Sequence, residues 1–354
     1  MNLEDIRKQI DILDGKLIKL LTDRMEQALL AKRFKTEVED KDREQQIIDK
    51  IRDNAQNLLD GDFLVMLYQK IIQESKELQK KDTKIIAFQG EHGAYSEVAA
   101  KSWNSNYIPL PCVEFADVFE GVKEGIYDYG IVPVENTLGG IVSQVNDLMI
   151  NTKLFVSGAI EIPVNHCLVT YQGTDHREIR EVYSHPQALA QCRGFLARNK
   201  LKGVHYYDTA GAAKMLSEKG LSNAAAISSV LAAKLYNLQI IKESVEDHEI
   251  NRTRFLILTK EENVEKGNKC SIVFSTAHKS GTLFSVLEKF AKAQLNLTRI
   301  ESVPNEKGNY AFFLDFLGER DDQKVSAVLE SVKEITEQFR VLGFYREKNI
   351  QVIL

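Results

Sequence analysis

A polar run directly before an apolar strand holds the residue types best suited to chemistry in this chain. Asn251–Arg252–Thr253–Arg254–Phe255 precedes apolar residues that continue to Leu258. Two guanidinium groups beside one hydroxyl could bind an anionic substrate, with Thr253 donating a hydrogen bond or a proton. The same residues could equally form a basic turn that leads into a strand. On their own they leave both interpretations open.

A second group of polar residues lies within the first 80 positions, on the apolar stripes of predicted helices. This segment lacks proline, and its apolar residues recur every three or four positions, which predicts three helices. Buried cations need a counterion, so an anionic ligand between the helices is one explanation. The other is that the long side chains reach solvent or pair with nearby acids. The polar residues are Arg24, Lys35, Arg43, Ser75 and Gln79, and the nearby acids are Asp40 and Glu44.

From Lys84 onward, strand and helix patterns alternate, which predicts parallel sheets covered by helices. Polar residues follow several of the strands, at the edge where ligands usually bind in such sheets. Each could instead cap a helix, as Thr209 would. These residues are Glu135, Asn136, Ser184, Gln187 and Thr209.

The region around Thr253 resembles the prephenate dehydratases. That family's signature ends on Thr-Arg-Phe followed by apolar residues, and its earlier positions match Tyr236, Leu238, Ile241 and Asp247. The resemblance implies that prephenate loses carbon dioxide and its ring hydroxyl to give phenylpyruvate, with Thr253 as hydrogen-bond donor or general acid. It also implies an α/β domain of two lobes, like type 2 periplasmic binding proteins, with a hinge near Pro163 and Tyr236. It assigns prephenate binding to Asn136, Ser184, Gln191, Arg254 and Glu135. Further candidates from the same resemblance are Ser96, Gln187 and Thr209.

Residues 1–81 resemble the all-helical chorismate mutases. The resemblance implies rearrangement of chorismate to prephenate, in which Lys35 and Gln79 stabilise negative charge on the breaking ether bond. Arg7 would reach into the site of a partner subunit, so a homodimer or higher homo-oligomer is expected. Glu44 would either be protonated or accept a hydrogen bond from the substrate hydroxyl, and the sequence leaves both open. The implied chorismate site consists of Arg7, Arg24, Lys35, Asp40, Arg43, Glu44, Ser75 and Gln79.

The apolar pattern of residues 268–354 predicts strands and helices in the order βαββαβ, which is typical of a ferredoxin-like α+β sandwich. Two segments, 280–284 and 297–304, resemble the regulatory motifs of the ACT domain of prephenate dehydratases. The resemblance implies phenylalanine as effector, bound at a subunit interface. Val303 departs from it, because the family carries arginine there. The alternative is a dimerisation domain without a ligand. The residues assigned to phenylalanine are Gly281, Asn296, Leu297, Glu301 and Ser302.

Composition excludes several classes of protein. The 354 residues carry a net charge of −5, which gives no basic surface for nucleic acid. No apolar run is long enough to predict a membrane helix, and the acidic start lacks a signal-peptide pattern, so a cytoplasmic protein is expected. The four cysteines and seven histidines are scattered, which indicates neither a metal site nor a cofactor.

These motifs together resemble a bifunctional chorismate mutase/prephenate dehydratase of phenylalanine biosynthesis. The expected domains are an all-helical mutase at 1–81, a two-lobed dehydratase at 82–262 and an ACT domain at 268–354. The alternative from another class is a solute-binding or sensor protein whose helical segment serves only to dimerise.

Overall fold

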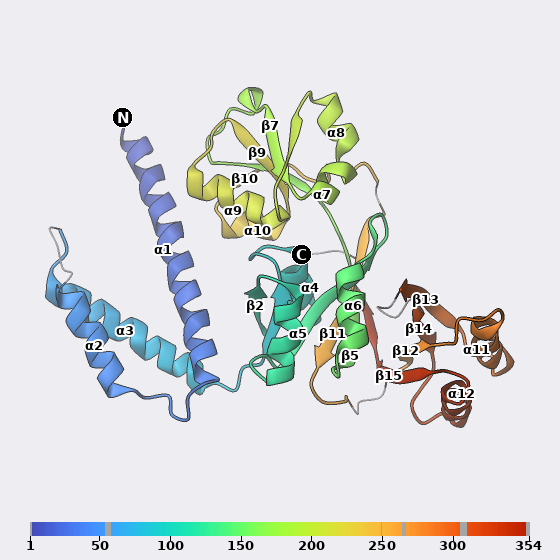
Figure 1. The fold of residues 1–354 in the computed structure, drawn as a ribbon. Coiled ribbons are helices and arrows are strands. Elements are labelled where there is room, and N and C mark those ends of the chain that lie inside the picture. The colour runs from blue at the N-terminus through green and yellow to red at the C-terminus, as the bar shows by residue number, and fades with distance from the viewer. Residues whose placement is uncertain (1, 54–57, 249, 264–266, 305–309, 352–354) are drawn as a thin grey trace. The chain divides into compact units, whose positions relative to one another are not determined.

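A computed structural model describes residues 2–53, 58–248, 250–263, 267–304 and 310–351 (Figure 1). The chain divides into two compact units, Met1–Thr83 and Lys84–Leu354. Within the described residues, no helix has both the length and the apolar character needed to cross a bilayer.

The described part of the first unit is helical, as the spacing predicts. It forms α1 (Leu3–Lys32), α2 (Lys41–Asp53) and α3 (Gly61–Lys80). Asp60 is the N-cap of α3, because its carboxylate accepts a hydrogen bond from Phe63 N at 3.2 Å. Leu29 and Ile72 are buried, whereas the first half of α1 exposes apolar side chains that its own unit does not cover. The exposed side chains include Ile6, Ile10, Leu13 and Leu17.

The second unit starts with a lobe built on a mixed sheet. Its strands are β1 (Ile85–Gln89), β2 (Ile108–Cys112), β3 (Tyr129–Asn136), β4 (Gly140–Ile141), β5 (Phe155–Pro163), β11 (Arg252–Thr259) and β16 (Glu347–Asn349). Its helices are α4 (Tyr95–Trp103), α5 (Phe115–Glu124) and α6 (Ser143–Asn151). The strand order is β16-β5-β11-β3-β1-β2, with β4 beside β3. Phe88, Ile131 and Ile257 are fully buried, which explains why these strands are continuously apolar.

A second lobe is inserted between β5 and β11. Its strands are β6 (Cys167–Thr170), β7 (Glu181–Ser184), β8 (Lys202–His205), β9 (Ala224–Ser228) and β10 (Gln239–Lys242), in the order β10-β6-β9-β7-β8. Its helices are α7 (Pro186–Gln191), α8 (Arg193–Arg198), α9 (Thr209–Lys219) and α10 (Val230–Leu235), with a 3₁₀ turn at His176–Glu178. The chain leaves the first lobe after β5 and re-enters it through β11.

This insertion corrects two expectations. The sheets are mixed rather than parallel, because β11 returns antiparallel to both β3 and β5, and β6 is antiparallel to β9. Tyr236 is not at a hinge: it is buried at the end of α10, and its hydroxyl donates to His92 O at 2.9 Å. The second connection between the lobes lies instead between β10 and β11.

The remaining residues form the predicted βαββαβ order. They are β12 (Lys269–Ser275), α11 (Thr282–Lys292), β13 (Leu297–Pro304), β14 (Tyr310–Leu317), α12 (Gln323–Lys333) and β15 (Gln338–Tyr345), and the antiparallel sheet has the order β13-β14-β12-β15. Phe290 and Val325 of the helices pack on one face of this sheet. The other face packs against the first lobe, where Phe313 and Met149 share one apolar cluster.

Candidate active sites

A cavity of about 330 Å³ lies between α1, α2 and α3. The predicted residues that line it are Arg24, Lys35, Asp40, Arg43, Glu44, Ser75 and Gln79. Arg7 does not line it, since it is exposed several turns earlier on α1. Because α1 ends at Lys32, Lys35 projects from the segment that follows this helix.

A hydrogen bond holds one cation of this cavity in position, and an ion pair holds another. Arg24 Nη1 donates to Ser75 Oγ at 2.6 Å, and Ser75 in turn donates to Ile71 O at 3.0 Å. Lys35 Nζ lies 3.7 Å from the Asp40 carboxylate. Cations fixed around a cavity of this size can hold a small dicarboxylate in one conformation.

Lys76 is a residue of this cavity that the sequence analysis missed. Its Nζ lies 3.0 and 3.1 Å from the two carboxylate oxygens of Glu44. Both oxygens of Glu44 therefore face the same ammonium group. The spacing could have indicated Lys76, because it follows the buried Ile72 by four positions and precedes Gln79 by three.

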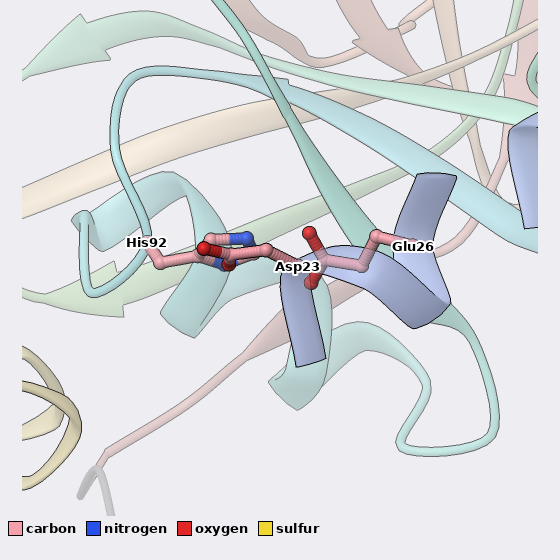
Figure 2. Close-up of side chains that lie close together, drawn as sticks. All are labelled: Asp23, Glu26 and His92. Atoms are coloured by element: carbon pink, nitrogen blue, oxygen red, sulfur yellow. The ribbon is translucent and has the colours of Figure 1, made fainter. Parts of the chain in front are cut away.

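Two carboxylates next to Arg24 in the sequence do not belong to this cavity. Asp23 and Glu26 project from α1 (Figure 2), and neither is among the residues that line the cavity. Asp23 instead accepts from Lys19 Nζ at 2.9 Å, one helical turn earlier. A pair at this spacing stabilises the helix by about 0.3 kcal/mol.

A larger cavity, of about 530 Å³, lies between the two lobes of the second unit. The first lobe contributes the end of β3 and the starts of β11, α4 and α6, and the second contributes α7 and the start of α9. The predicted residues that line it are Thr253, Asn136, Gln191, Ser96, Gln187 and Thr209.

Arg254, predicted to bind prephenate, lies on the other face of β11. Successive side chains of a strand point to opposite faces, so Thr253 and Arg254 cannot both face the cavity. The Arg254 guanidinium donates to Glu347, to Asp315 at 2.7 Å and to Tyr345 Oη at 3.0 Å. Because the residue is 4% exposed and its guanidinium is engaged there, the structure does not bring this predicted prephenate ligand to the cavity.

Glu135 and Ser184 are also outside the cavity. The Glu135 carboxylate lies 3.9 Å from Arg254 Nη1 and 3.6 Å from Arg299 Nε, on the side of the C-terminal sheet. Ser184 is fully buried and donates to Ile227 O at 2.7 Å. Neither residue is among those that line the cavity, so the structure does not bring these two predicted prephenate ligands to it.

Three amide side chains form a closed ring beside Thr253. Asn136 Oδ1 accepts from Gly139 N at 2.7 Å, and a backbone N–H can only donate, which fixes the orientation of the Asn136 amide. Asn136 Nδ2 therefore donates to Asn251 Oδ1 at 2.8 Å and to Thr253 Oγ1 at 2.9 Å. Asn251 Nδ2 donates to Gln191 Oε1 at 3.0 Å, and Gln191 Nε2 closes the ring on Asn136 Oδ1 at 3.4 Å. Thr253 accepts in this ring, so its hydroxyl hydrogen is available to a ligand.

Tyr95 and His166 line the same cavity and were not predicted. His166 Nε2 lies 2.8 Å from Gln191 Oε1, and Nδ1 lies 2.9 Å from Tyr95 Oη. Burial lowers the pKa of His166 and raises that of Tyr95 well above its ordinary value, so both are neutral near pH 7. No spacing marks His166 among the seven histidines of the sequence.

The described residues that line this cavity include neither lysine nor arginine. The anion site with two arginines, expected from the run around Thr253, is therefore not formed. Ser96 and Ser143 line the cavity from the first turns of α4 and α6, which have no side-chain cap. The amino ends of such helices carry partial positive charge and unpaired N–H groups, so anions can be bound there without a cationic side chain. Thr209 lines the cavity from α9, whose amino end is capped by the Asp208 carboxylate, an acceptor from Gly211 N at 2.8 Å.

The loop before α4 is fixed by close packing and by a buried carboxylate. Gly93 has a φ of 92°, and a Cβ there would lie 2.6 Å from Ala232 Cα, so this position requires glycine. The Glu97 carboxylate accepts from Gly93 N at 2.6 Å and lies 3.3 Å from Nδ1 of His92, which Figure 2 shows in this loop. These contacts set where α4 begins, and with it the position of Tyr95.

A cavity of about 240 Å³ lies beside the start of α11. Gly281 lines it with a φ of 87°, and a Cβ built there would meet no atom within 4 Å, so the backbone is open to a ligand. Phe284, Tyr310 and Phe312 add apolar surface. The other predicted regulatory residues do not line it, since they lie along or just before the edge strand β13; they are Asn296, Leu297, Glu301 and Ser302.

Val303 faces the first lobe and not this cavity. Its side chain is 5% exposed, and it lies opposite Ala311 in the register of β13 and β14. It shares an apolar cluster with Met149 and Phe313. The residue that departs from the ACT motif is thus part of the contact between the C-terminal sheet and the first lobe.

Comparison with known proteins decides the family. The family model described as prephenate dehydratase matches residues 86–263, and the one described as chorismate mutase type II matches residues 6–80. The bifunctional chorismate mutase/prephenate dehydratase of Aquifex aeolicus (strain VF5) is 34% identical over 370 residues, covering 99% of both chains. The chain belongs to the bifunctional chorismate mutase/prephenate dehydratases. It is an enzyme that rearranges chorismate to prephenate and converts prephenate to phenylpyruvate.

Other relatives match about three quarters or more of the chain. The arogenate dehydratase/prephenate dehydratase 2 of Arabidopsis thaliana is 36% identical over 326 residues, which are 84% of this chain and 86% of the relative. The solved structure of a prephenate dehydratase from Arthrobacter aurescens in complex with L-Phe is 26% identical, with a TM-score of 0.70, and the match covers 76% of this chain and 93% of that one. The bifunctional enzyme thus combines a helical mutase with an α/β dehydratase in one chain.

Proposed function

We propose that Thr253 donates the hydrogen bond, or the proton, with which hydroxide leaves prephenate. One observation carries this proposal: Thr253 Oγ1 accepts from Asn136 Nδ2 at 2.9 Å, which leaves its own hydrogen for the substrate. Aromatisation of the ring drives the loss of carbon dioxide and hydroxide. A threonine hydroxyl is a weak acid, but a hydrogen bond that it accepts makes it a better donor. Asn136 and Gln191 then orient Thr253.

The carboxylates of prephenate meet helix ends and neutral donors. This part of the proposal is supported by Ser96 and Ser143, which line the cavity from the first turns of α4 and α6. Thr209 lines it beside the capped start of α9 and offers a neutral hydroxyl. Phe255 lines the cavity next to Thr253 and offers the substrate ring an apolar contact. The absence of lysine and arginine among the described lining residues means that carbon dioxide can leave without breaking an ion pair.

In the helical unit, we assign chorismate binding to the cavity between the helices. Arg24 and Lys35 bind its carboxylates, and Lys35 with Gln79 stabilises charge on the ether oxygen. Glu44, with both oxygens accepting from Lys76, meets the substrate hydroxyl as an acceptor. The remaining members of this site are Asp40, Arg43 and Ser75, which line the same cavity.

We assign Arg7 to the mutase site of a second subunit. Support comes from its exposure outside the cavity and from the exposed apolar residues Ile10, Leu13 and Leu17 on the same helix. A stripe of this kind is stable in water when a partner helix covers it. The enzyme is therefore proposed to be a homodimer or a higher homo-oligomer.

We assign residues 268–354 as an ACT domain that binds phenylalanine. The cavity beside Gly281, with its open backbone and aromatic lining, supports this assignment. Asn296, Leu297, Glu301 and Ser302 would take part from a second subunit paired along the free edge of β13. The proposed domains are then 1–81, 82–262 and 268–354, and phenylalanine is the feedback inhibitor.

The roles of Arg24 and Thr253 are tested by assaying both reactions on two variants. Arg24→Ala should lower chorismate mutase activity at least about a hundredfold and leave dehydration of added prephenate unchanged. Thr253→Ala should do the reverse. If either variant lost both activities while its circular dichroism stayed unchanged, the assignment of the two sites would be wrong.

A further inference from the structure

Tyr95 and His166 lie behind the proposed reacting group: three hydrogen bonds connect His166 to Thr253, and a fourth connects Tyr95 to His166. His166 is 2% exposed, and Gln191 separates it from the Asn136 amide that reaches Thr253. A histidine buried in this way has to satisfy both ring nitrogens with hydrogen bonds. Neighbouring backbone groups, which can only donate or only accept, fix the direction of each of these hydrogen bonds.

Backbone groups determine the direction of the chain of hydrogen bonds. Asn136 Oδ1 accepts from the backbone nitrogens of Leu138 at 3.1 Å and Gly139 at 2.7 Å, and Asn136 Nδ2 donates to Arg252 O at 3.0 Å. The amide therefore has a single orientation. Because its oxygen is the acceptor, the group that approaches it from Gln191 is Nε2, a donor.

This orientation also fixes the tautomer of His166. Gln191 Oε1 accepts from Asn251 Nδ2, so the oxygen of Gln191 also faces His166 Nε2, which has to carry the ring hydrogen. Nδ1 of the neutral ring is then an acceptor, and the only hydrogen of the Tyr95 hydroxyl is shared between Nδ1 at 2.9 Å and Asn165 O at 2.7 Å. Glu246 adds a negative charge nearby, but it accepts from the backbone N of His166 at 2.8 Å.

We propose that Tyr95 and His166 are positioning residues of the dehydratase, which lock the Gln191 amide and so direct the Thr253 hydroxyl at prephenate. The donors run in one direction: Tyr95 to His166, His166 to Gln191, Gln191 to Asn136 and Asn136 to Thr253. No proton is transferred along this chain. Each bond polarises the next, and the final effect is a more acidic Thr253 hydroxyl that cannot turn back toward Asn136.

This inference rests on the proposed role of Thr253. Without the hydrogen on His166 Nε2, Gln191 Oε1 keeps only the donor Asn251 Nδ2. A half-turn of the Gln191 amide, which would set its oxygen against Asn136 Oδ1, is then opposed by one hydrogen bond fewer. Asn136 keeps its orientation, because backbone groups hold it, but the donor from Gln191 that polarises it is weakened, and the Thr253 hydroxyl becomes less acidic.

A matched pair of variants at His166 tests the proposal in the full-length enzyme. His166→Met keeps an unbranched side chain but has no donor, and it should lower the dehydratase kcat about tenfold while KM for prephenate stays within about twofold. His166→Gln restores a donor near Nε2 and an acceptor for Tyr95, so its kcat should stay within about threefold of wild type. Chorismate mutase activity of the same samples, from the helical unit, should not change.

Thr253→Ala is measured beside these variants so that the two proposals can fail separately. If Thr253→Ala is inactive and His166→Met has the wild-type kcat, the role of Thr253 stands and that of His166 is refuted. If His166→Gln loses as much as His166→Met, or if only KM rises, His166 fills space or binds substrate and the proposal is wrong. If Thr253→Ala remains active, both proposals fail.

Tyr95→Phe keeps the test decisive should His166→Met not fold. It removes one oxygen from the chain and should lower kcat about threefold at constant KM. A wild-type kcat in this variant would remove Tyr95 from the proposal, and a raised KM at constant kcat would mean that Tyr95 contacts the substrate directly.

Discussion

Arg254 is the residue for which the structure changes the expected effect of a mutation most. As a substrate ligand it would contribute to prephenate binding, but its guanidinium lies among Asp315, Glu347 and Tyr345 of the C-terminal region, 4% exposed. Arg254→Met keeps the length of the side chain and leaves two carboxylates without their buried partner. Removing one member of a buried ion pair costs about 3–5 kcal/mol, because the remaining charge stays desolvated.

The neighbouring Arg252 offers a control on the same strand and the same face. Its side chain is 21% exposed and pairs with the partly exposed Glu161. Arg252→Met should therefore lower the free energy of unfolding by only about 1 kcal/mol. The two variants differ in the burial of the lost ion pair, so the ratio of their losses in unfolding free energy measures the effect of that burial.

Urea denaturation followed by tryptophan fluorescence measures the difference in unfolding free energy between the two variants, in the unit Lys84–Leu354. Trp103 is the only tryptophan of the sequence, and it belongs to the first lobe of the dehydratase. Lys348 Nζ lies 4.6 Å from the centre of its ring, so the signal also senses the C-terminal segment. If Arg254→Met were as stable as Arg252→Met and instead raised KM for prephenate more than about tenfold, Arg254 would be a substrate ligand after all.

Lowering the pH should reduce the difference in stability between wild type and Arg254→Met. Burial by itself would raise the pKa of Glu347, but Arg254 and Lys269 outweigh it and hold that pKa below its ordinary value of 4.5. A carboxylate with a lowered pKa stabilises the fold fully above its unfolded value and loses this contribution as the pH falls through the folded value. The difference in unfolding free energy between the two proteins should therefore shrink below pH 4.5.

Three further predictions concern the mutase site and the C-terminal sheet. Mixing inactive Arg7→Ala with inactive Arg24→Ala subunits should restore part of the mutase activity, because one of the two sites in a heterodimer carries neither change; no recovery after verified subunit exchange would contradict a shared site. Lys76→Met should raise KM for chorismate by about tenfold, because Glu44 would lose the partner that holds both its oxygens, and unchanged steady-state kinetics would show that this ion pair is incidental. Phenylalanine should still bind and inhibit the wild-type dehydratase, and calorimetric titration without any binding heat at millimolar phenylalanine would exclude the sensing role. Val303→Arg should lower the free energy of unfolding by about 1–3 kcal/mol, because the larger side chain overpacks a buried contact.

Local patterns in the sequence were sufficient for the elements and for the family. Helical spacing before position 81, alternating strands after it and the βαββαβ order at the end each follow from short-range periodicity, which depends on neighbours in the chain. Arg24, Arg43, Ser75 and Gln79 of the mutase cavity were predictable for the same reason. They lie on helical stripes, so that a position in the sequence fixes the face on which a side chain appears.

The dehydratase site was decided by tertiary structure. Thr253 and Arg254 look equivalent in the sequence, but the pleat of β11 sends one to the cavity and the other to the C-terminal sheet. His166 carries no motif and gains its position only because the chain crosses between the lobes beside Gln191. Residues 95, 136, 166, 191 and 253 come together across more than 150 positions of sequence, and periodicity contains no information about contacts at that separation. The sequence by itself determined which family of reactions this protein catalyses, while the packing of two lobes decided which side chains reach the substrate, because only packing brings distant strand ends to one cavity.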